Sequence, residues 1–336
     1  MTQKLTNVDL KNYTTFGVSA LATDFATFSN EGEARKLTLN NTQEILILGG
    51  GSNLLMTHDF KGLVLKNEIK GITCVEKNET SVVLKVGAGE IWHDFVLYTI
   101  EQGYYGIENM SLIPGSVGAS PMQNIGAYGV EIKDVFEKLE ALEIATGEVH
   151  TFSKDECAFG YRESVFKRAL KGKYIITNVY FRLSLTKKLS THYGAIESEL
   201  ANQGITSPTS KDVSNAVIAI RSSKLPNPKE LGNAGSFFKN PVVSIEIYNK
   251  IKTSYPNAPS YPVSETNVKV PAGWLIETAG WKGKQVGACG VHKNQALVLV
   301  NYGNATGNEI YALSTAIIED VYQKFGISLE REVNII

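Results

Sequence analysis

Cysteine is scarce in this chain of 336 residues, which has only Cys74, Cys157 and Cys289. An odd number of widely separated cysteines fits neither a disulfide framework nor the paired spacing of a zinc site. We therefore expect the three thiols to be buried hydrophobic groups. The histidines show no metal-ligand spacing either, so the sequence predicts no metal site.

An excess of charge of one sign is also lacking, because the formal net charge is only -1. This balance gives no electrostatic case for binding nucleic acid or an anionic membrane surface. No apolar run approaches the roughly 20 residues that cross a bilayer. The N-terminus contains no apolar core of the kind found in signal peptides. We therefore expect a cytoplasmic protein.

Hydrophobic residues make up 43% of the chain and charged residues 20%, as in ordinary globular proteins. The length exceeds that of a typical single core, so two or three domains are expected. Apolar periodicity mixes helices with strands. Helices are expected at 31–39, 91–102, 212–223, 271–277 and 310–325, and strands at 45–48, 135–145, 149–152, 174–183, 296–300 and 327–336.

Three local predictions accompany these elements. Asp212 is expected to cap the helix over 212–223, and Tyr193 to lie in a polar loop. The stretch 221–228 contains Pro226 and Pro228. We interpret it as a domain junction, because proline ends regular structure.

Two glycine-rich stretches, 49–53 and 113–129, dominate the first half of the chain. The first follows the apolar strand expected at 45–48, and such a turn can bring backbone amides up to a phosphate. The second is rich in glycine and proline yet interleaved with apolar anchors, and its free amides suit an extended anion such as a pyrophosphate. A plain strand-to-loop turn and a tight connector are the respective alternatives. Neither stretch has the G-x-G-x-x-G spacing of a Rossmann fingerprint.

The stretch 232–241 reads Gly-Asn-Ala-Gly-Ser-Phe-Phe-Lys-Asn-Pro. Its glycines permit a tight turn and a close approach to a ligand. One interpretation is a surface loop that Phe237 and Phe238 anchor to the core. The other is an active-site loop that presents Ser236 to a substrate.

Five separated stretches together resemble the UDP-N-acetylenolpyruvoylglucosamine reductases, the MurB-type flavoenzymes of peptidoglycan precursor synthesis, in their longer subtype. They occur in the order expected for the family and span nearly the whole chain. The stretches are 49–53, 113–129, 160–162, 232–241 and 329–333.

The resemblance implies an α+β fold with a two-part FAD-binding domain of the vanillyl-alcohol-oxidase (PCMH) type and a C-terminal α+β substrate-binding domain. The implied boundaries are 1–70 with 325–336 for the first FAD-binding subdomain, 71–225 for the second, and 226–324 for the C-terminal domain.

The resemblance also implies site residues at matching positions. Arg162, Ser236 and Glu332 fall on the catalytic positions. The residues expected to bind FAD are Gly50, Gly51, Ser52, Asn53, Ser116, Gly118, Ala119, Ser120, Asn124, Gly126 and Ala127. Those expected to bind the UDP-sugar are Tyr193, Lys224, Asn240, Lys282 and Gln295.

The implied reaction is the reduction of UDP-N-acetylglucosamine-enolpyruvate to UDP-N-acetylmuramate by NADPH through non-covalently bound FAD. Arg162 is expected to hold the substrate carboxylate as charge develops on it. Glu332, kept protonated by burial, would donate a hydrogen bond to the same group. Ser236 would supply the proton that completes the lactyl ether. The product serves cell wall biogenesis, and with it cell shape, division and the cell cycle.

Two positions depart from the family pattern, since Arg331 stands where relatives often have proline and Asn334 where some have arginine. Two other functions remain open. An oxygen-using FAD oxidase of the same superfamily would often carry covalent flavin, yet neither glycine-rich stretch contains histidine or cysteine. A non-catalytic UDP-sugar or flavin-binding module would not need the serine, glutamate and arginine together. No obligate protein partner is indicated.

Overall fold

The computed structural model describes residues 3–336 and divides into two compact units. Unit 1 consists of residues up to Val8, then Ala22–Gly51 and Phe60–Ser223. Unit 2 consists of Asp9–Leu21, Ser52–Asp59 and Lys224–Ile336. The division after Ser223 lies within the stretch 221–228. The three-part arrangement expected from the family resemblance stays a prediction.

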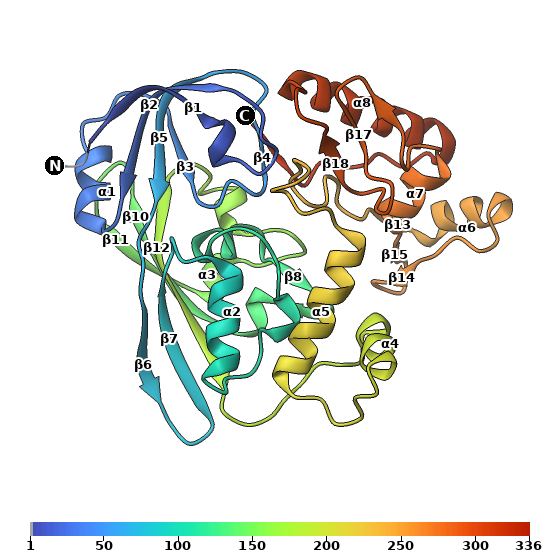
Figure 1. Ribbon diagram of the computed structural model, residues 1–336, viewed down its shortest axis with the longest axis horizontal. Coiled ribbons are helices and arrows are strands. Elements are labelled where there is room, and N and C mark those ends of the chain that lie inside the picture. Colours follow the sequence, from blue (N-terminus) through green and yellow to red (C-terminus); the bar gives the residue numbers. More distant parts are fainter. Residues whose placement is uncertain (1–2) are drawn as a thin grey trace. The chain divides into compact units, whose positions relative to one another are not determined.

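The main sheet of unit 1 has five antiparallel strands in the order β11-β10-β12-β7-β6 (Figure 1). Its longest strand, β12, pairs Val179 with Val86 of β7 and Phe181 with Leu84. Both sets of side chains are apolar and buried, as expected for central strands. The bounds are β6 Ile72–Lys77, β7 Ser81–Gly87, β10 Phe136–Glu143, β11 Val149–Ser153 and β12 Tyr174–Ser184.

Helix α2 (Trp92–Glu101) supplies the aromatic centre of the core next to this sheet. The Trp92 ring packs edge-on against Phe95 and Phe181, with centroids 5.8 and 5.9 Å apart. Such edge-to-face pairs add to the free energy gained by burying the rings. The expected helix over 91–102 is therefore confirmed.

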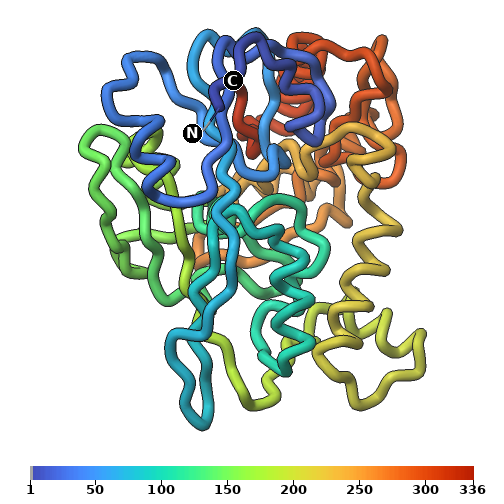
Figure 2. The backbone as a smooth tube through the Cα atoms, turned by 60° about the vertical axis from the view of Figure 1, so that its left-hand side comes forward, coloured from blue at the N-terminus to red at the C-terminus, as the bar shows by residue number. Residues whose placement is uncertain are grey.

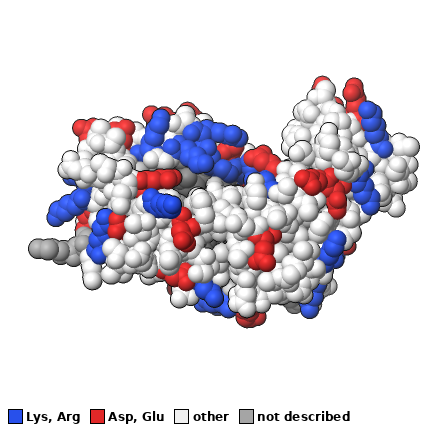
Figure 3. Space-filling model, turned by 90° about the horizontal axis from the view of Figure 1, so that it is seen from above, with Lys and Arg blue, Asp and Glu red and all other residues white. Residues whose placement is uncertain are grey.

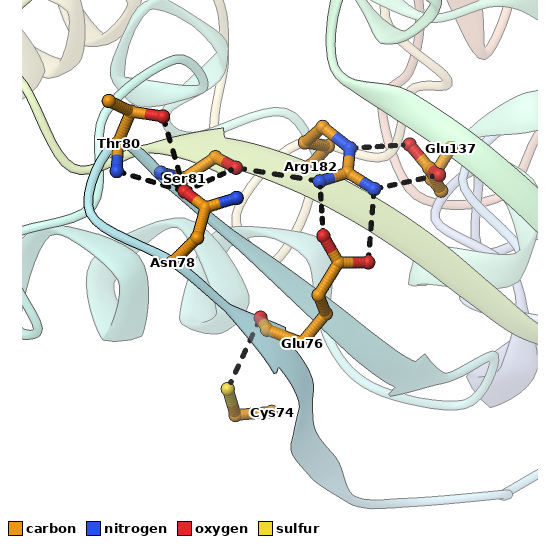
Figure 4. A network of polar contacts seen from close by, with 7 residues as sticks. All are labelled: Cys74, Glu76, Asn78, Thr80, Ser81, Glu137 and Arg182. Carbon is orange, nitrogen blue, oxygen red and sulfur yellow. Dashed lines mark hydrogen bonds and ion pairs between the residues drawn. The ribbon is translucent and has the colours of Figure 1, made fainter.

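Arg182 ties three strands of the sheet together (Figure 4). Its Nε donates to Glu137 Oε2 of β10 at 2.8 Å, and its Nη1 donates to Glu76 Oε1 of β6 at 2.9 Å. The guanidinium lowers the pKa of both carboxyl groups through hydrogen bonds and charge. This network joins the turn end of the β6–β7 hairpin, which extends from unit 1 in Figures 1 and 2, to β12 and β10.

A second sheet in unit 1 has the strand order β1-β2-β5-β3. Strands β2 and β3 both run parallel to the central strand β5. Its core includes Phe28 and Leu65, with Ala34 of α1 packed against them. The bounds are β1 Leu5–Asp9, β2 Leu21–Phe28, α1 Glu31–Thr38, β3 Ile45–Leu48 and β5 Phe60–Asn67.

Helices α4 (Gly194–Asn202) and α5 (Ser210–Lys224) form a small core of their own in unit 1. Tyr193 is the last residue of the loop before α4, as expected, but the helix itself was not predicted. Asp212 does not cap α5, because its own amide donates to Thr209 Oγ1 while its carboxylate accepts from Thr209, as in a capping box.

Unit 2 combines short strands with three helices. The long helix α8 (Gly307–Phe325) begins at a Thr306–Glu309 capping box and ends at Gly326, whose φ is 68°. This helix confirms the expected one. The remaining bounds are α6 Ile245–Ser254, α7 Ala272–Thr278, β4 Leu54–Leu55, β13 Val242–Ser244, β14 Tyr261–Pro262, β15 Asn267–Lys269, β16 Gln285–Val286, β17 Cys289–Val291, β18 Leu299–Asn301 and β19 Asn334–Ile335.

The core of unit 2 places the apolar face of α8 against β17, β18 and α7. Ile310, Leu313 and Ile317, spaced three and four residues apart along α8, are all buried. Strands are shorter here than expected. The strand predicted over 327–336 is a two-residue strand, β19, paired in parallel with β4, and β18 begins at Leu299 instead of Ala296.

The thiol predictions hold for two cysteines out of three. Cys157 and Cys289 are buried, and burial raises the pKa of Cys157 to about 12. Cys74 is exposed on the edge strand β6, so the prediction is wrong there.

Acidic and basic side chains both occur on the face shown in Figure 3, in line with the nearly neutral net charge. Residues 3–336 contain no group of three or more His, Cys, Asp or Glu side chains placed to hold a metal ion. Nor does any helix in that range combine the length and apolarity needed to cross a membrane.

Candidate active site

The two glycine-rich stretches meet within unit 1. A methyl group added at Gly50 would lie 2.7 Å from Gly115 Cα, and one added at Gly49 would lie 2.4 Å from Ser116 Oγ. Real Cβ atoms do not approach other heavy atoms this closely, and at Gly50 the obstacle is backbone, so glycine is required where the stretches cross. Stretches expected from the sequence to serve one ligand are thus neighbours.

The amides of the second stretch differ from the prediction. The backbone N–H groups of Val117, Gly118 and Ser120 donate to Glu90, Ala88 and Val117 carbonyls at 2.8–3.0 Å. The first two bonds tie the stretch to residues 88–90, and the third closes a short 3-10 turn, so these three amides are not free to bind an anion. Gly118 also packs on Ala88, where an added methyl group would lie 2.5 Å from the Ala88 Cβ.

Arg162 lies at the tip of a four-residue turn in unit 1. The backbone groups of Gly160 and Glu163 exchange hydrogen bonds of 3.0 and 3.3 Å across the turn. Arg162 adopts φ 54°, a left-handed conformation that is uncommon for a residue other than glycine. Its Nη2 donates to the Gly126 carbonyl at 2.7 Å, which fixes the guanidinium beside the second glycine-rich stretch.

Two residues expected to bind FAD use their side chains within the protein. Asn124 Nδ2 donates to the Gly160 carbonyl at 3.0 Å, and Asn124 Oδ1 accepts from the Lys133 amide at 3.0 Å. Ser120 Oγ donates to the Val117 carbonyl at 2.7 Å. Asn124 therefore fastens the Arg162 turn to the glycine-rich stretch.

Arg221 and Tyr128 join the surroundings of Arg162, and the sequence analysis missed both. The Tyr128 ring packs edge-on against Tyr193 with centroids 5.4 Å apart. The Arg221 side chain interacts with the Tyr128 hydroxyl, and its Nε is buried without a hydrogen-bond partner among residues 3–336. Burial, and to a smaller degree the neighbouring Arg162, lowers the pKa of Arg221. Two cations and two phenols thus gather in unit 1.

Ser236 lies in a central segment of unit 2 that has neighbours on both sides. It forms a bridge with Val298, and the Phe237 amide donates to the Leu297 carbonyl at 2.7 Å. On the other side, the Glu332 amide donates to the Phe237 carbonyl at 2.8 Å, and Lys239 donates to Glu330. This pairing brings the Ser236 and Glu332 segments together although they are far apart in sequence.

Phe237 and Phe238 hold the segment in the core, as expected. Both side chains are almost completely buried, and their ring centroids lie 5.2 Å apart. The two nearby glycines differ in role. Gly232 lies against the Phe16 carbonyl, which an added methyl group would approach to 2.3 Å, whereas Gly235 has φ 70° and open space around its Cα.

Asn53 supports the Glu332 segment in unit 2. Asn53 Nδ2 donates to the Glu332 carbonyl at 3.3 Å, and the Asn334 amide donates to the Asn53 carbonyl at 3.1 Å. Asn334 Nδ2 donates to the same carbonyl, also at 3.1 Å. Asn53, expected at the FAD, thus also positions an expected catalytic segment.

Asn240 and Gln295 both lie at the start of α7. Asn240 Oδ1 accepts the Ala272 amide at 2.9 Å and so caps the helix, while Gln295 Oε1 lies beside Gly273. Lys282 forms an exposed ion pair with Glu277 at 2.8 Å. Lys224, the last residue of α5, is exposed.

His292 is a further residue that the sequence analysis left without a role. It lies at the end of β17, where its amide donates to the Val298 carbonyl at 2.9 Å. Its side chain is buried, and no residue in the range 3–336 bonds to Nδ1. Burial, with a smaller effect of Lys293, lowers the pKa of His292.

The structure therefore assembles two groups of residues. In unit 1 the glycine-rich stretches meet, and the Arg162 turn adjoins the second of them together with Tyr128, Tyr193 and Arg221. In unit 2 the Ser236 segment is paired with the Glu332 segment, and Asn53, Asn240 and Gln295 contact the same part of the unit.

Comparison with known proteins gives the same order of domains along the chain. Residues 33–153 match the model of an FAD binding domain. Residues 227–336 match the model of the UDP-N-acetylenolpyruvoylglucosamine reductase C-terminal domain.

Two relatives named UDP-N-acetylenolpyruvoylglucosamine reductase are similar over almost their whole length. One, from Flavobacterium johnsoniae, is 54% identical over 98% of this chain and 98% of its own. Another, from Pseudomonas putida, is 48% identical over 98% of this chain and 97% of its own.

A solved structure of the reductase from Thermus caldophilus is similar in fold, with a TM-score of 0.68 at 23% identity. It covers 100% of this chain and 98% of that one. The predicted α+β fold, with an FAD-binding domain followed by a C-terminal α+β domain, is thereby confirmed.

Proposed function

Because this chain belongs to the family of UDP-N-acetylenolpyruvoylglucosamine reductases, which are FAD-dependent oxidoreductases, we propose that it reduces the enolpyruvyl ether of UDP-N-acetylglucosamine-enolpyruvate to UDP-N-acetylmuramate. NADPH is the proposed reductant. UDP-sugars and NADPH are cytoplasmic metabolites, so the proposal places the reaction in the cytoplasm, in the synthesis of peptidoglycan precursors. Identity of 54% over 98% of the chain is the main support for this assignment.

The residues of the glycine-rich stretches fit an FAD pyrophosphate. Glycine is required where Gly50 crosses Gly115, and this crossing brings two turns to one place. Gly51, with φ 60°, turns the first stretch as glycine does in anion-binding turns. We propose that 50–53 and 115–116 hold the pyrophosphate, while 118–127 shapes its surroundings. When bound, FAD supplies hydride transfer from the nicotinamide to the substrate.

Arg162 is the proposed partner of the substrate carboxylate. Its charge is permanent, and its planar fork matches a carboxylate. The turn places it in a strained conformation that the surrounding hydrogen bonds maintain, and such strain is concentrated at functional sites. As negative charge develops on the carboxylate, the fixed guanidinium stabilises it without reorganising. Tyr128 and Arg221, beside it in unit 1, favour an anion there.

The pairing of the Ser236 and Glu332 segments is the structural observation that carries the proposed chemistry. A serine hydroxyl is a weak acid, so it protonates a carbon only when a strongly basic enolate is held against it. Phe237 and Phe238 limit the motion of Ser236, and two hydrogen-bonded neighbours fix its backbone. Glu332, on the adjacent segment, is proposed to stabilise the same developing charge by a hydrogen bond.

The remaining predicted contacts are proposed to bind the UDP-sugar. The Tyr193 ring packs edge-on against the Tyr128 ring, and its exposed part can contact a ligand. Lys224 offers an exposed ammonium group for phosphate, as does Lys282. Asn240 and Gln295 are held at the start of α7 and present amide groups there.

The proposal is tested by turnover of the purified protein. We expect NADPH oxidation to require the enolpyruvyl UDP-sugar and to yield one UDP-N-acetylmuramate per NADPH, with or without oxygen. An oxidase of the same superfamily would instead consume oxygen. A binding module would take up FAD or the UDP-sugar with no turnover. Either of these results would contradict the proposed reaction.

A further inference from the structure

Arg331 bonds to α8 immediately before Glu332 in the chain. Its Nε donates to Ser314 Oγ at 2.8 Å, and its Nη2 donates to Thr315 Oγ1 at 2.6 Å. Its guanidinium carbon lies 4.4 Å from the centroid of the Tyr311 ring. One side chain thus makes three contacts with one turn of a helix.

The hydroxyl groups of α8 that contact Arg331 are oriented as hydrogen-bond acceptors. Ser314 Oγ donates its hydrogen to the Tyr311 carbonyl at 2.6 Å, and Thr315 Oγ1 donates to the same carbonyl at 3.1 Å. A hydroxyl has a single hydrogen, so both oxygens can then only accept from a further partner. Arginine is a pure donor with a planar fork and also stacks on an aromatic ring, so it satisfies all three groups at once.

Backbone pairing connects Arg331, and through it α8, to the segments that contain Ser236 and Glu332. Arg331 forms a bridge with Phe238, flanked by hydrogen bonds from Lys239 to Glu330 and from Glu332 to Phe237. Asn53 Nδ2 donates a hydrogen bond to the carbonyl of Glu332, the residue that follows Arg331. The position of Glu332 is therefore fixed on one side by Asn53 and on the other by Arg331.

We infer that Arg331 is a positioning residue, which holds Glu332 in place for the reduction by fastening its segment to α8. The inference rests on the proposed function. Arg331 reaches α8 instead of the substrate, so its effect is on the placement of Glu332. Displacing a catalytic group by about an ångström can slow a reaction by up to about a hundredfold.

The test compares the two half-reactions of Arg331→Gln. We expect reduction of bound FAD by NADPH to stay within about twofold of wild type, while reoxidation by the enolpyruvyl UDP-sugar slows about tenfold or more. Lys324→Gln is the control, because Lys324 is an exposed cation of α8 whose Nζ bonds to the Thr278 carbonyl. It should leave both half-reactions unchanged.

A second pair of variants removes only one acceptor. Thr315→Val deletes the hydroxyl while keeping the side-chain volume, and Thr315→Ser keeps the hydroxyl. Reoxidation should slow in the valine variant relative to the serine variant. This pair decides the matter if Arg331→Gln fails to fold or slows both half-reactions alike.

A double variant separates positioning from general destabilisation. If Arg331 acts through Glu332, then adding Arg331→Gln to Glu332→Gln should slow reoxidation little further. The inference would be overturned if the double variant slowed reoxidation by the product of the two single-variant factors. Reoxidation at the wild-type rate in Arg331→Gln, or at equal rates in the two Thr315 variants, would overturn it as well. A wild-type protein that the substrate does not reoxidise would instead refute the proposed function, and with it the inference.

Discussion

Arg162 combines a permanent positive charge with a left-handed backbone. Its turn is held by the Gly160–Glu163 backbone pair and by the Asn124 side chain. A left-handed conformation is unfavourable for arginine and persists only where its surroundings impose it. The side chain is thereby aimed before a substrate arrives.

Replacing Arg162 with lysine should impair turnover although the charge is kept, because the fork that matches a carboxylate is lost. We expect kcat, measured as substrate-dependent NADPH oxidation, to fall about tenfold to a hundredfold. Arg168→Lys is the matched control, since Arg168 is an exposed arginine nearby that pairs with Glu163. Equal activity of the two variants would remove Arg162 from the mechanism.

Replacing Ser236 with alanine should separate the two half-reactions. Flavin reduction by NADPH needs no proton from Ser236 and should change less than about twofold, while reoxidation by substrate should slow about a hundredfold or more. Stopped-flow absorbance of the flavin measures both rates. Ser328→Ala, at an exposed serine of unit 2, should alter neither. Equal slowing of both half-reactions by Ser236→Ala would indicate a structural role.

At the scale of single residues, the sequence predicted the candidate site residues but not the contacts that hold them. The motifs located Arg162, Ser236 and Glu332, and Phe237 and Phe238 are buried as expected. The left-handed turn at Arg162 could not be predicted, because arginine has no local preference for it. Arg221 and His292 were missed, since burial of a lone polar side chain depends on tertiary packing.

The segment 232–241 behaves as an element, because backbone partners fix it along both edges. Val298 and Leu297 pair with it on one side and residues 330–332 on the other. Its two phenylalanines fill the core of unit 2. The loop is therefore both anchored and placed beside Glu332, so the two interpretations of this stretch are compatible.

Phe237→Leu should loosen this anchor. The smaller side chain leaves a cavity, and we expect a loss of about 1–2 kcal/mol in the free energy of unfolding in urea. Reoxidation by substrate should slow as well, because Ser236 follows the movement of its neighbour.

Phe28→Leu provides the control for Phe237→Leu. Phe28 is equally buried but lies in the β2–β5 sheet of unit 1. It should cost similar stability and leave reoxidation unchanged. If both variants slow reoxidation equally, the anchor has no specific link to Ser236.

Elements with long apolar periodicity were predictable, and short ones were not. Helices α2 and α8 match their predicted ranges closely. The strands of unit 2 have two or three residues, too few to show an alternating pattern. Helix α4 was missed because it buries only Ile196 and Leu200, against α5.

At the scale of the whole molecule, two compact units each carry part of the predicted site. Unit 1 holds the glycine-rich crossing and Arg162, and unit 2 holds Ser236 and Glu332. Family motifs spread over the whole chain predicted the α+β class and the FAD-binding domain. The length of the chain alone predicted only the number of domains, two or three. The assignment of residues to each unit could not be predicted, because both units contain segments from distant parts of the sequence.

The stability of the fold should fall on mild acidification. His93 Nδ1 accepts the Leu112 amide at 3.0 Å, so the ring must be neutral there, and burial lowers the pKa of His93. Arg221 lowers it further, while Asp94 opposes the shift. A depressed pKa means that the folded chain binds fewer protons than the unfolded chain. The stabilisation is therefore present above about pH 6.5 and is lost as pH falls through the folded pKa.

This dependence is measured as the free energy of unfolding between pH 7.5 and pH 5.5. Wild-type protein should lose stability with a slope of at most about 1.4 kcal/mol per pH unit from this residue. His93→Gln should show a shallower slope, with a remainder of the same sign from His292. An unchanged slope would show that His93 titrates alike in both states.

The most direct test of the central claim is an anaerobic titration of the purified protein. It should carry a yellow flavin chromophore that NADPH bleaches. Addition of UDP-N-acetylglucosamine-enolpyruvate, without oxygen, should restore the colour in a one-to-one ratio as UDP-N-acetylmuramate forms. A colourless protein that does not bind FAD, or a bleached flavin that only oxygen reoxidises, would contradict the account.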